Sequence, residues 1–220
     1  SYPVTVIFMA FAVGSNLGTS VIVSRLFGAK EYGRMRTAVT TAFIACVGMS
    51  LLLTAYGLAF CTPMMRWIHT PEDILADGAL YLRIYVMGLS FLLFYNVCTG
   101  IFTALGDSKT PLYFLIGSSI GNIVLDCLFV AVFHMGVAGV AWATFIAQGI
   151  SAVLALSTLA VRLRRFHQGS RPRLFDASLL WRIAAIAVPS IMQQSVLSVG
   201  NLFVQEIVNR YGSAVIAGYS

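Results

Sequence analysis

The sequence predicts an all-α integral membrane protein, a bundle of several membrane-spanning helices. Of its 220 residues, 59% are hydrophobic and only 10% are charged, whereas a soluble domain carries about 25% charged residues. The mean hydropathy is +0.87, and several uncharged runs reach the roughly 20 residues that a helix needs to cross a bilayer. These properties argue against a soluble enzyme, a disordered chain and a nucleic-acid-binding domain, so we expect no nucleic acid among the partners.

Six segments have the length and composition of membrane spans. Runs of this length predict helices, because the strands of a membrane barrel are about 10 residues long and alternate in polarity. The first segment lacks the basic start of a signal peptide, and residues 211–220 resemble the entry into a further helix, so we expect the chain to continue at both ends. The six segments are 1–24, 37–65, 84–106, 111–133, 138–161 and 183–208.

Local signals support several of the boundaries between these segments. Residues 70–73, Thr-Pro-Glu-Asp, form a capping-box pattern that starts a helix before the third segment. Gly106 is suited to end the third segment, and Thr110 with Pro111 to start the fourth. The fourth and fifth segments share one apolar run, which the turn 134–139 divides.

The basic residues predict the orientation of the spans. All Lys and Arg residues except Arg66, Arg83 and Arg210 lie in loops 25–36, 106–110 and 162–182, which strict alternation of the spans places on one side. The positive-inside rule assigns that side to the cytoplasm. Residues 162–182 form the longest and most basic gap, so we expect an inter-lobe linker there, between N-terminal lobe helices in 1–161 and the start of a second lobe in 183–220.

One carboxyl group lies deep within a predicted span. Asp126 has Asn122 four residues before it, which places both on one helix face, and an ionisable group in a span is a functional candidate because of its cost. Thr144 and Gln148 lie on the next segment at matching depths, about 9–15 Å from the outer ends at 1.5 Å per residue. The pattern predicts a site for a proton or a monovalent cation at Asn122, Asp126 and Thr144. Hydrogen bonding between helices, or pairing of the acid with a distant Arg, is the alternative interpretation.

The last span has one polar face. The pattern predicts either the wall of a water-filled cavity, to which Gln148 would also contribute, or a seam between helices. Glu206 lies near the outer end of this span, and its i, i+4 spacing from Arg210 predicts an ion pair. The polar face consists of Gln194, Ser198, Asn201 and Gln205.

Two Gly-x-x-x-Gly motifs, at residues 14–18 and 117–121, would permit helices to approach closely. Motifs of hydrolases, zinc proteases and phosphate-binding loops are absent from the sequence, and its three histidines are scattered through predicted loops. We therefore expect no catalytic residues, no metal cluster and no cofactor.

Three stretches together resemble the multidrug and toxic compound extrusion (MATE) transporter family. The first, GSNLGTSVIVSRLFGAK at 14–30, is similar to the family's second helix and its basic exit. The second, TALGDSKTP at 103–111, is similar to the cytoplasmic turn between helices four and five. The third is the pair Asn122 and Asp126, followed by GVAGVAWAT at 136–144 and by Gln148.

The resemblance implies a two-lobe transporter of twelve helices, of which this chain would hold helices two to seven. It implies an antiporter in a prokaryotic plasma membrane that exports organic cations or other amphipathic drugs in exchange for H⁺ or Na⁺. The partners would be such a substrate, the lipid bilayer and the remaining helices. Asn122, Asp126 and Thr144 match three positions of the family's ion site; its fourth group, an Asp on helix one, lies outside this sequence. Some relatives place an acid on helix seven, where Glu206 lies.

Three alternatives remain at this point. A lipid-linked oligosaccharide flippase of the same superfamily would tend to hold a cavity Arg for pyrophosphate, and the predicted spans carry none at mid-depth. An integral membrane enzyme would need a nucleophile with its base, or a metal cluster. A scaffold without transport would leave the cost of burying Asp126 unexplained.

Overall fold

The computed structural model describes residues 2–67, 72–166 and 173–210, and these ranges are almost entirely helical. Apolar runs uninterrupted by strand or turn signals form long helices because each backbone polar group is then satisfied within its own segment. The elements are α1 (Tyr2–Gly28), α2 (Tyr32–Trp67), α3 (Glu72–Met87), α4 (Leu89–Ala104), α5 (Lys109–Cys127), the π-helical turn η1 (Leu128–Val132), α6 (Gly136–Arg164) and α7 (Ala177–Arg210).

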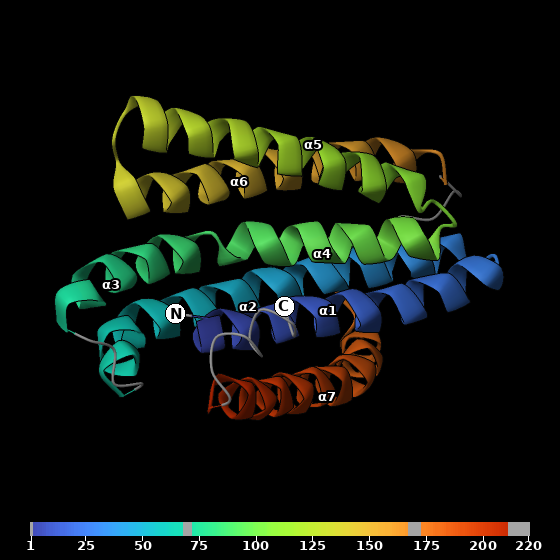
Figure 1. Ribbon diagram of the computed structural model, residues 1–220. Coiled ribbons are helices and arrows are strands. Elements are labelled where there is room, and N and C mark those ends of the chain that lie inside the picture. The colour runs from blue at the N-terminus through green and yellow to red at the C-terminus, as the bar shows by residue number, and fades with distance from the viewer. Residues whose placement is uncertain (1, 68–71, 167–172, 211–220) are drawn as a thin grey trace.

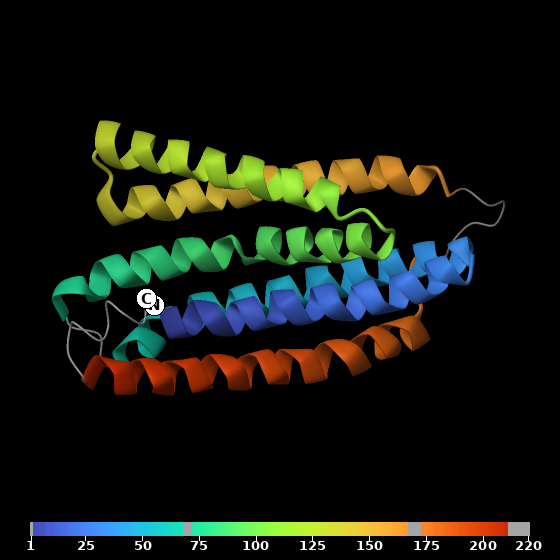
Figure 2. The same ribbon diagram turned by 45° about the vertical axis from the view of Figure 1, so that its right-hand side comes forward.

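The helices lie side by side and form layers (Figure 1). α5 and α6 pack against each other on one side of the bundle, α4 lies in the middle, and α7 covers the opposite side. α1 is enclosed between α4 and α7, and both views show this order (Figure 2). The α5–α6 pair therefore forms a separate layer, connected to the rest chiefly through α6, which packs on α3 and α4.

The core lies where α1, α2 and α4 meet. Met35, Val23 and Phe102 are fully buried there, and many of the other buried residues are alanines. Small residues allow helices to approach closely, which matters in lipid because packing rather than water exclusion drives helix association there. Of α5, by contrast, only Pro111 is buried among the described residues.

The third predicted span differs from the structure. The sequence predicted one continuous segment over 84–106, but the chain is bent by 47° between α3 and α4. The break falls at Gly88. A Cβ atom at this position would lie 3.3 Å from Gln148 Oε1 of α6. Glycine is the poorest helix former after proline, and here it also gives α6 room to pack. α3 itself begins at Glu72, and residues 70 and 71 of the predicted capping box lie outside the described residues.

Within the described ranges, four helices are long and apolar enough to cross a membrane, namely α1, α2, α5 with η1, and α6, and the bent pair α3–α4 makes a fifth. α7 was predicted as the sixth span. Its 34 residues extend about 50 Å at 1.5 Å per residue. Its described part, however, is not among the helices with the length and apolar composition of a membrane span. Its crossing of the membrane therefore stays a prediction.

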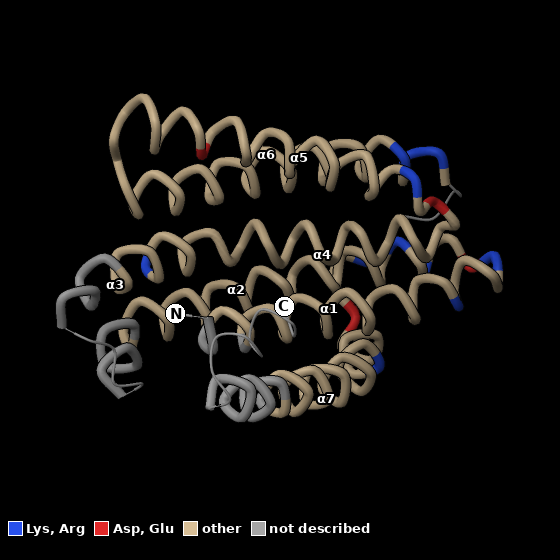
Figure 3. Tube along the Cα trace, in the orientation of Figure 1, with Lys and Arg blue, Asp and Glu red and all other residues tan. Residues whose placement is uncertain are grey.

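The basic loops lie at one end of the bundle. Figure 3 shows Lys and Arg gathered where α1, α4 and α6 end and where α2, α5 and α7 begin. This is the arrangement that alternation of the spans predicted, and the assignment of this end to the cytoplasm remains a prediction. We refer to it below as the basic end.

The predicted linker 162–182 is shorter in the structure, because α6 continues to Arg164 and α7 begins at Ala177. Its second part is attached to α2: Thr40 Oγ1 donates to the carbonyl of Arg173 at 3.4 Å, and the Asp176 N–H donates to Thr41 Oγ1 at 3.1 Å. Asp176 in turn caps α7, because its Oδ1 accepts the Ser178 N–H at 2.8 Å. The linker therefore fixes where α7 begins relative to α2, and the division into lobes stays a prediction.

Candidate ion-binding site between α5 and α6

The structure brings together the three residues that the sequence predicted for ion binding. Asn122 and Asp126 lie one turn apart on α5, and Thr144 faces them from α6. The antiparallel packing of α5 on α6 brings them together, because residues at equal distances from the connecting turn face each other. The predicted cluster of amide, carboxyl and hydroxyl groups therefore exists as a geometric unit.

The side-chain amide of Asn122 has two orientations with different partners. In one, Nδ2 donates to Thr144 Oγ1 at 3.5 Å. In the other, Nδ2 donates to Asp126 Oδ2 at 3.3 Å while Oδ1 accepts the Thr144 N–H at 3.2 Å. In the second orientation the NH₂ group faces an acceptor and the carbonyl oxygen faces a donor, so it satisfies both ends of the amide better than the first.

The other carboxylate oxygen of Asp126 has a different environment. Oδ1 is buried and has no hydrogen-bond partner within the described part of the chain. A buried carboxylate oxygen without a partner is costly, and the cost falls when the group binds a proton or a cation. Asp126 therefore combines one oxygen within hydrogen-bond distance of Asn122 with one buried oxygen that has no partner among the described residues.

Thr144 also connects this cluster to the break between α3 and α4. Its Oγ1 donates to the carbonyl of Val140 at 3.0 Å, which leaves lone pairs of the hydroxyl for a further partner. Thr144 and Gln148 line a narrow space beside the bend. Its other lining residues are Tyr81, Ile84, Tyr85 and Gly88 around the bend, and Ala141 and Phe145 on α6. Gln148, predicted to line a cavity, thus packs against the bend rather than beside Asp126.

The turn that follows Asp126 is π-helical. The N–H of Phe133 donates to the carbonyl of Leu128 at 3.1 Å, five residues back. Single π-helical turns inside α-helices occur frequently at functional sites. The sequence offered no signal for this turn, because Leu128–Val132 is a uniformly apolar segment.

The polar face predicted on the last span is only partly described. Gln194 and Ser198 are half-buried, and Ser198 Oγ donates to the carbonyl of Gln194 within α7 at 2.7 Å. The side chains of Asn201, Gln205 and Glu206 lie outside the described part of the chain. Whether this face lines a cavity therefore stays a prediction.

α7 approaches α1 closely along the first Gly-x-x-x-Gly motif. A Cβ on Gly14 would lie 2.3 Å from Ile191 Cγ1, and one on Gly18 would lie 2.7 Å from the carbonyl oxygen of Ile183. Around Gly117 and Gly121 of the second motif there is open space within 4 Å. The first motif is a helix contact of the kind that the sequence predicted, and the second makes no such contact with the described residues.

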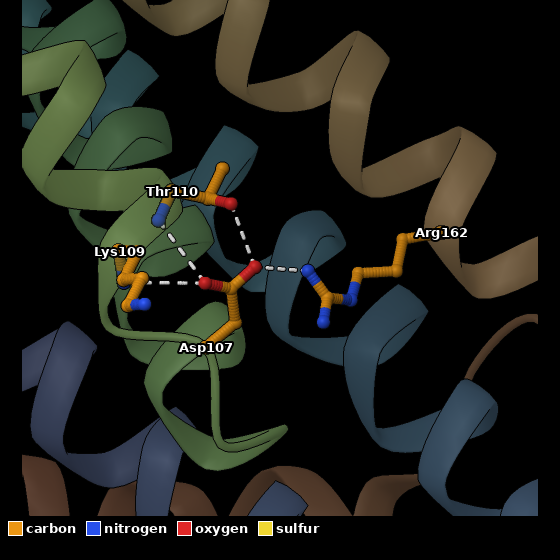
Figure 4. A network of polar contacts seen from close by, with 4 residues as sticks. All are labelled: Asp107, Lys109, Thr110 and Arg162. Carbon is orange, nitrogen blue, oxygen red and sulfur yellow. Dashed lines mark hydrogen bonds and ion pairs between the residues drawn. The ribbon is translucent and has the colours of Figure 1, made fainter.

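A second polar cluster, which sequence reasoning missed, lies at the basic end. Asp107 precedes α5, and its Oδ1 accepts the N–H groups of Lys109 at 3.2 Å and of Thr110 at 3.1 Å (Figure 4). Its Oδ2 accepts the Thr110 hydroxyl at 2.6 Å and a bond from Arg162 of α6. Hydrogen bonds from Thr110, together with Arg162, hold the pKa of Asp107 below its ordinary value. An acid followed by Ser, Thr and Pro at a helix start is a capping signal that could have revealed half of this cluster.

The turn that holds Asp107 has a specific backbone form. The Gly106 N–H donates to the carbonyl of Thr103 and the Asp107 N–H to that of Phe102, which is the Schellman motif that ends a helix. Gly106 adopts the left-handed φ of +79° that this motif requires. The glycine thus ends α4, as predicted, and places Asp107 to cap α5.

No group of three or more His, Cys, Asp or Glu side chains suited to a metal ion lies among the residues described. The geometry instead defines a multi-pass α-helical membrane protein with a polar site between two neighbouring helices. Its site has one acid, one amide and one hydroxyl.

A family profile described as MatE matches residues 1–128. The chain belongs to the MATE family. It is 31% identical over 212 residues to the probable multidrug resistance protein YpnP of Bacillus subtilis, covering 96% of this chain and 47% of YpnP. It is 30% identical over 229 residues to the probable multidrug resistance protein YoeA of the same organism, covering 99% of this chain and 49% of YoeA.

Solved structures share the fold. A MATE structure in complex with MaD3S matches with a TM-score of 0.87 at 23% identity, covering 96% of this chain and 48% of that one. An inward-facing multidrug resistance MATE transporter matches with a TM-score of 0.81 at 24% identity, covering 90% and 45%. The chain spans about half the length of the relatives it matches. It therefore corresponds to about half of each of these proteins.

Proposed function

We propose that this chain forms the ion-coupling half of a secondary active efflux transporter, which exports organic cations or other amphipathic compounds in exchange for H⁺ or Na⁺. One observation carries the proposal: Asp126 is placed with Asn122 and Thr144 between α5 and α6, and its Oδ1 is buried without a partner among the described residues. The names of the relatives, multidrug resistance and export proteins, support the efflux class.

The coupling step follows from the chemistry of the cluster. In one of its orientations the Asn122 NH₂ donates to Oδ2 of Asp126 at 3.3 Å and leaves Oδ1 without a partner among the described residues. Binding of H⁺ or Na⁺ to Oδ1 removes the penalty of the buried charge. If the amide turns, its carbonyl oxygen joins Thr144 Oγ1 and the carboxylate as oxygen ligands of the kind that hard cations take. Ion entry from one side and release to the other would then drive the substrate outward by alternating access.

The decisive test uses the full-length protein in proteoliposomes. Counterflow of a fluorescent organic cation is measured under opposed H⁺ and Na⁺ gradients. Asp126→Asn keeps the size of the side chain and removes its charge, so we expect it to abolish gradient-driven efflux at unchanged expression. Cys127→Ala, on the exposed neighbouring residue, is the matched control and should transport normally.

The results discriminate clearly. Efflux by Asp126→Asn at the wild-type rate under both gradients would reject the role of this acid. Stimulation of the wild type by only one gradient identifies the coupling ion. Substrate movement by the wild type that ignores both gradients would reject antiport.

A further inference from the structure

A cavity of about 420 Å³ opens at the basic end of α6, away from the Asp126 cluster. It lies on the surface formed by the last turns of this helix. Among the described residues its lining consists of Ser157, Thr158, Val161, Arg162 and Arg165.

The lining supplies positive charge and hydrogen-bond donors. Arg165 has no ion pair with another described residue, and no acid is among the described lining residues. Arg162 donates to Asp107, but a guanidinium has five N–H donors in a planar fork, so others remain for the cavity. Two guanidinium groups beside a hydroxyl from Thr158 are suited to the oxygens of a phosphate.

An exposed apolar stripe runs from this cavity along α6 toward the midpoint of the helix. Ile150, Val153 and Leu154 are exposed in this stripe, and Val161 at its end is 60% exposed and also lines the cavity. Spacings of three, four and seven residues place them on one face, a different face from that of Thr144. A charged pocket that continues into an exposed apolar stripe fits an amphipathic ligand better than a soluble anion.

The position of the cavity selects the class of that ligand. It lies at the level where basic residues from several helix ends gather (Figure 3), and in a membrane this is the level of lipid headgroups. Clusters of Lys and Arg just beyond the end of a membrane-spanning helix attract the headgroups of anionic lipids. The headgroup of one lipid molecule would then contact the arginines of the cavity, and its acyl chain would pack on the apolar stripe.

We propose that this cavity binds one anionic phospholipid, with Arg165 and Thr158 on its phosphate and an acyl chain along the stripe that ends at Val161. Arg162 would contact the same phosphate while holding Asp107. The bound lipid would thereby be linked to the turn that caps α5. This binding does not depend on whether the protein is an antiporter.

The test measures lipid retention by the purified full-length protein. Native mass spectrometry counts adducts after exposure to phosphatidylglycerol or to phosphatidylcholine. We expect phosphatidylglycerol to be retained preferentially, and Arg165→Gln to reduce that retention about tenfold, the loss expected when charge-assisted hydrogen bonds are removed. Arg164→Gln is the matched control, because it removes the same charge one residue away, outside the described lining of the cavity. It should retain the lipid as the wild type does.

A second variant guards against a general loss of charge or fold. Thr158→Val keeps every charge and should still reduce phosphatidylglycerol retention severalfold. Equal loss in Arg164→Gln and Arg165→Gln would overturn the proposal in favour of diffuse attraction. Equal retention of both lipids by the wild type would overturn it as well. Glycerol phosphate that displaces phosphatidylglycerol at equal concentration would identify a soluble anion as the occupant and reject the lipid.

Discussion

Asp107 and Arg162 form an ion pair that joins the start of α5 to the end of α6, 55 residues further along the chain. The same carboxylate caps α5 through Thr110. α5 carries Asp126 and α6 carries Thr144, so this pair fixes the relative height of the two helices whose facing side chains form the candidate site. A contact at the basic end of the bundle thus positions the candidate site farther along the same two helices.

Substitution of Asp107 should lower the stability of the protein through two separate losses, that of the helix cap and that of the ion pair. Asp107→Ala removes both the cap and the ion pair, and loss of a cap costs about 1 kcal/mol, while a partly exposed ion pair adds 0–1 kcal/mol. Asp107→Asn keeps an acceptor for the α5 N–H groups, so it should lose less. Thermal unfolding in detergent measures both changes. Lys109→Gln, whose backbone N–H makes the bond to Asp107, is the control and should unfold as the wild type does; an Asp107→Ala protein of unchanged stability would contradict the assigned role.

The contribution of Asp107 should depend on pH in one direction. Its pKa is lowered in the folded protein from the ordinary 3.8 by hydrogen bonds from Thr110 and by Arg162. A lowered pKa means that the ionised form is the stabilised one, so the contribution is fully present above the unfolded-state pKa and is lost as the pH falls through the folded-state pKa. The stability difference between wild type and Asp107→Asn should therefore stay constant above about pH 5 and shrink below about pH 4. A difference that grows in acid would show the opposite linkage.

The two glycine motifs should respond oppositely to alanine. In Gly18→Ala the new Cβ would lie 2.7 Å from the carbonyl oxygen of Ile183, and this backbone atom moves only if α7 does, so we expect loss of stability. In Gly117→Ala the space is open, and alanine should stabilise the helix by up to about 1 kcal/mol. Melting temperatures in one detergent compare the pair directly. Equal shifts in the same direction would mean that α1 and α7 do not pack in this way.

The hydroxyl of Thr144 should matter for ion binding while its methyl group does not. Thr144→Val keeps the shape and removes the oxygen, so ion-driven efflux should need about tenfold more of the coupling ion, as loss of one ligand worth about 1.4 kcal/mol predicts. Thr144→Ser keeps the oxygen and should behave as the wild type. The measurement is the ion concentration for half-maximal efflux in proteoliposomes. If both variants match the wild type, the hydroxyl is no ligand.

The helices and the candidate cluster were within reach of sequence reasoning because each depends on periodicity and length. Runs without charge gave the positions of the long helices, and equal distances from the 134–139 turn correctly placed Asn122 and Asp126 opposite Thr144. Antiparallel neighbours joined by a short turn have little freedom of register. These predictions needed only the geometry of a helix.

The remaining features depend on contacts that are remote in sequence or on local backbone choices. The bend at Gly88 needs α6 beside it, and the sequence does not distinguish that glycine from Gly100 in the same predicted span. Arg162 and Asp107 lie in two different predicted loops. The positive-inside rule counts the charges in each loop but does not predict which of them pair. The contact of α7 with Gly14 is likewise set by tertiary packing.

The π-helical turn Leu128–Val132 lies between Asp126 and the end of the fourth predicted span. A π-helical turn holds about one residue more than an α-helical turn for the same rotation, so a one-residue deletion within Leu128–Val132 would restore ordinary α-helical spacing there. Phe133 and the residues beyond it would keep nearly the same azimuth, and so would Asn122 and Asp126. The outer tip of the crossing is thus free to vary in length without turning the carboxyl group away from Thr144.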